Sequence, residues 1–131
     1  MIYLDSNVVI RLVEGDNQPR QQLELRLFSS LGKPGTLVTS RLTRLERRTK
    51  PLKTSDFRTL AQFDVFFAGQ ELMMIEVTES IIELATELRA RFNLRTPDAL
   101  HYATAVVCGA RVFLTGDLAF ARLTEIPVEL L

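Results

Sequence analysis

The sequence predicts a three-layer α/β/α domain with a mostly parallel central sheet. Short β-prone runs alternate along the chain with longer stretches whose apolar residues recur at helical spacing. No internal repeat, low-complexity tract or linker interrupts this alternation. Because 131 residues are an ordinary length for one domain, we expect residues 1–131 to form a single unit.

Two strands and four helices are expected in the first half of the chain. A buried strand ends at Asp5, and helical spacing begins directly after it. Ser40 is placed to cap the third helix, and Pro51 is expected to break it. The expected strands are 1–4 and 36–39, and the expected helices are 8–13, 19–31, 41–50 and 57–67.

The second half of the chain predicts two well-defined strands, an edge strand and two helices. Thr78 or Ser80 is expected to cap the first of these helices. Thr96 is the expected N-cap of the second, and Pro97 its first helical residue. The expected strands are 72–77, 111–114 and 126–130, and the expected helices are 81–88 and 99–108.

The composition excludes several classes of protein. Sixteen Lys and Arg residues balance sixteen Asp and Glu residues, so no overall basic field marks the chain for nucleic-acid binding. The single Cys108 cannot form an internal disulfide, which is typical of a cytoplasmic protein. Neither a signal sequence nor an apolar run of about 20 residues is present. We therefore expect a soluble cytoplasmic protein that has no membrane partner.

Four acidic residues lie at or near positions where α/β folds carry functional sites, at strand ends and helix starts. Asp5 and Asp117 follow strands, and Asp98 opens a helix, where the helix dipole favours negative charge. Glu46 shares a helix face with the apolar Leu42. Each acid has a structural explanation when considered singly. In a parallel sheet, however, strand ends and helix starts lie at one edge, so the acids are expected to gather there.

Gathered carboxylates predict a hard divalent cation. Their charges repel one another, and a bound cation removes that repulsion. Oxygen ligands without a His or Cys cluster favour Mg²⁺ or Mn²⁺ over zinc, and we interpret the lone His101 as part of an apolar helix. Such metals suit phosphoryl chemistry. The chain has no glycine-rich phosphate loop, nucleophile elbow or dinucleotide-binding fingerprint.

Four segments, in their order and spacing, carry a resemblance to a known family. They are YLDSN at 3–7, TSRLTRLE at 39–46, TPDALHYATA at 96–105 and FLTGD at 113–117. Together they resemble PIN-domain ribonucleases, most closely the VapC-type toxins of bacterial and archaeal toxin-antitoxin modules. The resemblance spans nearly the whole chain and implies a PIN-like fold and Mg²⁺- or Mn²⁺-dependent endoribonuclease activity on RNA.

The resemblance also assigns site residues and partners. Asp5, Asp98 and Asp117 would bind the metal, while Glu46 would bind it or orient the attacking water. The small hydroxyl positions of the family would hydrogen-bond carboxylates or water. The family further implies a homodimer or a larger complex with a small cognate antitoxin that occupies a groove near the acids. The matching hydroxyl residues are Ser6 and Thr115.

The segment around Glu46 is more basic than the resemblance leads us to expect. As a hypothesis, Arg41, Arg44 and Arg48 contact RNA phosphates. They are equally consistent with a solvated helix face or with a surface that receives an acidic antitoxin segment.

Other functions remain open at this point. A PIN-type nuclease could act on DNA or in RNA processing, and a non-catalytic RNA-binding or scaffold protein could keep the same acids. A receiver domain also gathers acids and Mg²⁺ at a sheet edge. It is disfavoured because Asp5 lacks a second acid beside it and because Thr115-Gly116-Asp117 stands where a receiver carries lysine.

Overall fold

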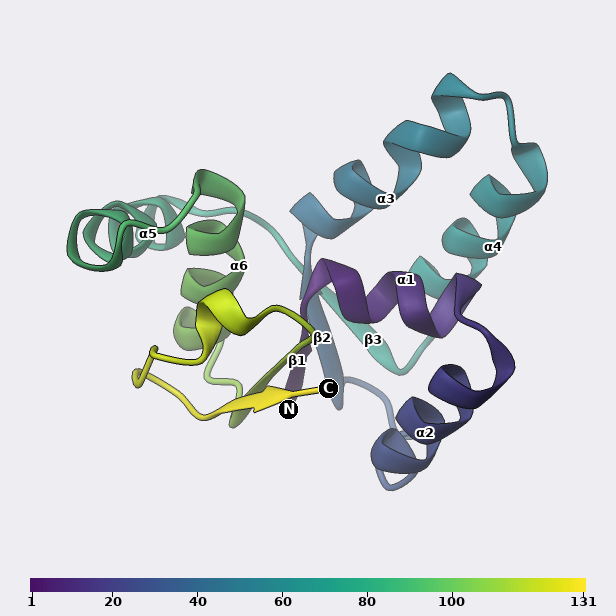
Figure 1. The fold of residues 1–131 in the computed structure, drawn as a ribbon, viewed down its shortest axis with the longest axis horizontal. Coiled ribbons are helices and arrows are strands. Elements are labelled where there is room, and N and C mark those ends of the chain that lie inside the picture. Colours follow the sequence, from purple (N-terminus) through teal and green to yellow (C-terminus); the bar gives the residue numbers. More distant parts are fainter.

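A five-stranded sheet lies between two groups of helices in the computed structural model, which describes all residues from 1 to 131 (Figure 1). All strands are parallel, in the order β3-β2-β1-β4-β5. The predicted three-layer α/β/α fold is therefore confirmed. The strands are β1 (Ile2–Leu4), β2 (Leu37–Ser40), β3 (Leu72–Ile75), β4 (Val112–Thr115) and β5 (Val128–Leu130). The helices are α1 (Ser6–Glu14), α2 (Asn17–Leu27), α3 (Arg41–Lys53), α4 (Phe57–Phe67), α5 (Glu79–Phe92), α6 (Thr96–Val107) and the short η1 (Leu118–Phe120).

Successive side chains of the strands pack alternately into two separate hydrophobic cores. In β1, Tyr3 packs on the side covered by α5 and α6, while Ile2 and Leu4 pack on the side covered by α1, α2 and α4. Figure 1 shows α5 and α6 on one side of the sheet and α1 to α4 on the other. Because both faces are covered, the short central strands are almost completely buried.

The order of the strands reverses at β1. From β1 the chain moves outward through β2 and β3, and then returns to build β4 and β5 on the other side of β1. The segments that follow β1 and β4 lie on opposite faces, since α1 joins one core and η1 the other. Ligands of open α/β sheets bind at such a reversal of strand order.

Two local predictions about helix ends are wrong, and a third, which left two candidate residues, is decided. Pro51 lies inside α3, near its end, and proline removes only the one hydrogen bond that its own amide would have donated. Arg95 takes the N-cap position expected of Thr96, because the Ala99 amide donates to the Arg95 carbonyl. Of the two candidate caps of α5, Thr78 is the cap.

No helix of the chain is both long enough and apolar enough to span a membrane.

Candidate active site

Asp5 lies directly after β1, where the strand order reverses, and only 4% of its surface is exposed. Its Oδ1 accepts a hydrogen bond from the Ser6 amide at 2.8 Å. Its Oδ2 accepts from Asn7 Nδ2 at 2.9 Å and from the Thr115 hydroxyl at 2.8 Å. Burial nevertheless raises the pKa of Asp5, so these donors do not replace all the solvation that the carboxylate has lost.

The loop after β4 is attached to the start of α1. Asn7 accepts a hydrogen bond at Oδ1 from the Gly116 amide at 2.8 Å, while its Nδ2 donates to Asp5. The Asp117 amide donates to the Thr115 hydroxyl at 3.0 Å, and the Asp117 carboxylate accepts from the Ala119 amide at 2.9 Å. Asp117 thus caps η1, while its amide donates to the hydroxyl that contacts Asp5.

Glu46 reaches the same region from α3 through a buried histidine. Glu46 Oε1 lies 2.6 Å from His101 Nε2, and this nitrogen is 4.0 Å from Asp5 Oδ1. On the other side of the ring, His101 Nδ1 lies 2.7 Å from the Tyr3 hydroxyl. Burial acts to raise the pKa of Glu46, but the hydrogen bond with His101 and the charge of Arg47 hold it below its usual value.

Asp98, in the first turn of α6, is the fourth acid and is almost fully buried. Its Oδ2 accepts a hydrogen bond from Arg95 Nε at 3.2 Å. This contact, together with the negative charges of Asp98, Asp117 and Glu46, raises the pKa of Arg95. The charge of Asp98 also acts to raise the pKa of Asp5. The four acids therefore lie near common neighbours at one edge of the sheet.

The chemistry of these residues fits a hard divalent cation. The four acidic side chains would bind a metal through carboxylate oxygen atoms, which are the ligands that hard cations prefer. The buried Ser6 hydroxyl, which lies next to Asp5 in the sequence, has no hydrogen-bond partner. A cation beside Asp5 would supply the positive charge that burial of this carboxylate demands. In the present arrangement, no three His, Cys, Asp or Glu side chains already enclose a metal position.

Three residues of the hydrogen-bond network around the acids received no role from the sequence. They are Tyr3, Asn7 and His101. Asn7 stands two residues after Asp5, and His101 stands three after Asp98, on the same helix face. These spacings were the available signals, but neither predicts a partner that is distant in sequence.

The three arginines expected to contact RNA are all in ion pairs. Arg41 lies 2.6 Å from Glu76. Arg44 and Arg48 both contact Asp64 of α4, at 3.3 and 2.8 Å. A phosphate would have to compete with these carboxylates, so the hypothesis of RNA contact stays a prediction.

Comparisons with known proteins identify the fold. A family model described as the PIN domain matches residues 2–126. No curated protein sequence matches the chain.

Several solved structures superimpose along almost the whole chain. A DNA-bound VapBC from Salmonella typhimurium has a TM-score of 0.80 at 21% identity, covering 98% of this chain and 96% of that one. VapBC2 from Rickettsia felis, bound to a promoter DNA fragment, has a TM-score of 0.77 at 20% identity, covering 98% of both chains. Mycobacterium tuberculosis VapC20, described as a sarcin-ricin loop cleaving toxin, has a TM-score of 0.71 at 20% identity, covering 97% of this chain and 99% of that one.

The raised pKa of Asp5 predicts how Asp5→Asn changes stability with pH. A carboxyl group whose pKa is raised by folding destabilises the folded protein when it is ionised. This loss in the free energy of unfolding is absent below the pKa of the unfolded state and complete above the pKa of the folded state. In chelator, the free energy of unfolding of Asp5→Asn relative to wild type is expected to rise with pH through that window. Weaker hydrogen bonding to the amide adds an offset that does not vary with pH. Urea unfolding between about pH 4 and about pH 8 measures the difference, and a difference that stays constant would contradict the prediction.

Proposed function

Since the chain belongs to the PIN-domain family, we propose that it is a metal-dependent endoribonuclease and the toxin of a toxin-antitoxin pair. The observation that carries this proposal is the position of the buried Asp5 at the reversal of strand order, with Glu46, Asp98 and Asp117 around it. The toxin-antitoxin complexes of the same fold support the assignment to a toxin. A homodimer, which the resemblance implies, stays a prediction.

The residues of the site divide the work of phosphodiester hydrolysis. Asp5 and Asp98, with Asp117 beside them, would hold Mg²⁺ or Mn²⁺, which when bound polarises the scissile phosphate and makes water more acidic. Glu46 has a lowered pKa and therefore stays ionised at neutral pH. One of its oxygens accepts from His101, which leaves Oε2 to orient the attacking water and accept its proton. Arg95, exposed beside Asp98, is placed to contact a phosphate of the RNA.

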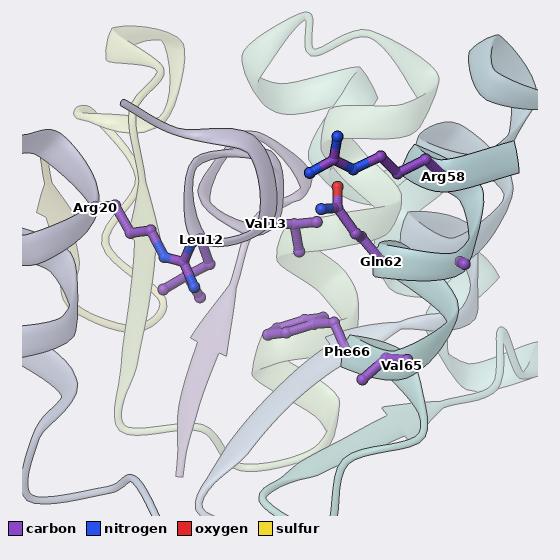
Figure 2. Close-up of a pocket in the computed structure, with 8 residues that line it drawn as sticks. Leu12, Val13, Arg20, Arg58, Gln62, Val65 and Phe66 are labelled. Atoms are coloured by element: carbon purple, nitrogen blue, oxygen red, sulfur yellow. The ribbon is translucent and has the colours of Figure 1, made fainter. Parts of the chain in front are cut away.

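We assign the proposed antitoxin to an apolar groove between α1, α2 and α4. The groove has a volume of about 560 Å³, and Leu12, Val13, Val65 and Phe66 supply its apolar lining. Figure 2 shows Phe66 extending from α4 toward α1, with Arg20 and Arg58 on opposite sides. Val65 is 73% exposed, so its apolar side chain is accessible to a partner. A segment with an apolar centre and acidic flanks would match this surface.

The nuclease assignment predicts a metal-dependent cleavage that Asp98→Asn abolishes. The amide keeps the size of the side chain and an acceptor for Arg95, but it removes the charge that a divalent cation needs. The rate of cleavage of a labelled RNA pool in Mg²⁺ or Mn²⁺ is expected to fall by at least about 100-fold, because removal of a metal ligand costs several kcal/mol of transition-state stabilisation. EDTA is expected to stop the wild type. Equal cutting by the two folded proteins would contradict the proposed site, and a matched DNA pool tests the choice of substrate.

The basic face of α3 predicts opposite effects from two sets of variants. Reversing charge at Arg44 and Arg48 is expected to weaken RNA binding and to flatten its dependence on salt, by about 0.7 in logarithmic slope for each phosphate that the protein no longer binds. Asp64→Asn is expected to strengthen binding, because it releases both arginines from their shared carboxylate. Fluorescence anisotropy at salt concentrations from about 50 to about 300 mM, on either side of the physiological value, measures both effects. Unchanged binding in both sets would leave these arginines as a solvated face.

The groove predicts that Val65→Glu weakens binding of the antitoxin. The probe is the small protein encoded beside the toxin, and its dissociation constant is expected to rise at least about tenfold, because a charge would enter an apolar contact. Leu25→Glu is the matched control, since Leu25 is 74% exposed on α2 but does not line the groove. Equal weakening by both variants would remove the assignment of the groove, while RNA cleavage by free Val65→Glu is expected to stay at the wild-type rate.

A further inference from the structure

We propose that His101 is a positioning residue that holds Glu46 in its working orientation, and that Tyr3 in turn holds the imidazole ring. This inference rests on the proposed function, in which Glu46 acts on the attacking water or on the metal. It is carried by a continuous set of hydrogen bonds from β2 through β1 and α6 to α3. The residues in it are Ser40, Tyr3, His101 and Glu46.

The direction of each hydrogen bond follows from the chemistry of the groups. An ionised Glu46 can only accept, so the proton of the 2.6 Å contact belongs to His101 Nε2. In a neutral ring, Nδ1 then carries no proton and accepts from the Tyr3 hydroxyl at 2.7 Å. The same hydroxyl oxygen accepts from the Ser40 amide at 3.2 Å. Every polar group in the chain of bonds is thus satisfied by one arrangement of protons.

Packing fixes the ring as firmly as the hydrogen bonds do. His101 is 1% exposed and Tyr3 is fully buried. The Tyr3 ring stacks on Phe113 with centroids 5.2 Å apart, and its centroid lies 6.1 Å from that of His101 in an edge arrangement. Neither ring can turn without disturbing the core between the sheet and α6.

The hydrogen bond with His101 restricts the orientation of the Glu46 side chain. Its side chain is a quarter exposed and belongs to α3, while Asp5 and Asp98 belong to the end of β1 and to α6. A free glutamate at this rim would sample several rotamers, and the hydrogen bond with His101 selects one. Since His101 shares α6 with Asp98, and Tyr3 shares β1 with the segment leading to Asp5, the bond places Glu46 relative to the other acids.

The first test asks whether the hydrogen bond exists in solution and needs no nuclease activity. The chain has one histidine, so its ring nitrogens give unambiguous signals in long-range ¹H–¹⁵N NMR spectra. In the wild type we expect the Nε2–H tautomer, with a proton protected from exchange with water. In Glu46→Ala we expect that protection to disappear. An Nδ1–H tautomer, or identical ring signals in the two proteins, would overturn the inference.

The second test compares His101→Gln with His101→Met. Glutamine keeps an amide donor near the position of Nε2, whereas methionine fills a similar volume without a donor. In steady-state RNA cleavage, Met is expected to lower kcat by about 10- to 100-fold at unchanged KM, and Gln to recover most of that loss. Equal kcat values for the two folded variants would show that His101 only fills the core.

A third readout separates this inference from the proposed function. Crystal structures of the same proteins are expected to show Glu46 ordered in the wild type and His101→Gln, and disordered in His101→Met. If the wild type cuts no RNA, the nuclease proposal fails, but the order of Glu46 still decides whether His101 positions it. An ordered Glu46 in His101→Met would overturn the inference even if all three proteins were active.

Discussion

The burial of one carboxylate at the end of the central strand is the constraint that the rest of the site depends on. A charge removed from water needs hydrogen-bond donors, and Asp5 draws them from α1 and from the end of β4. These bonds join the two strands at which the order of the sheet reverses. Burial still raises the pKa of Asp5, which means that its ionised form is not fully stabilised by these bonds. A cation bound beside Asp5 would stabilise it.

The hydrogen bonds that stabilise the site also divide it into rigid and adjustable parts. Asp5 and Asp98 are nearly buried and belong to the central strand end and to a core helix. Glu46 and Asp117 are more exposed, the first on α3 and the second in the loop before η1. Each of these two is tied back to the buried pair through an intermediate group, His101 in one case and Thr115 in the other. The geometry of the exposed acids therefore depends on residues that do not themselves act on the substrate.

The sequence predicted the positions that follow from local patterns, and it missed those that follow from packing. Asp5 and Asp98 were placed correctly at a strand end and a helix start because alternation and capping signals are read within a few residues. For Glu46, the local pattern showed only a helix face shared with the apolar Leu42. The structure instead pairs Glu46 with His101, which is 55 residues distant. That pairing depends on the placement of α3 relative to α6 in the folded chain, which no short-range signal encodes.

The helix that begins at the acids also lines the proposed antitoxin groove, and this connects inhibition to the site. Asn7 lies in the first turn of α1, and Val13 of the groove lies near its other end. At about 1.5 Å per residue, the two positions are separated by roughly 10 Å along the helix axis. An extended chain advances about 3.3 Å per residue, so a segment seated in the groove reaches the acids with roughly three further residues. An antitoxin segment that continued along α1 from the groove would therefore block the access of RNA to the acids.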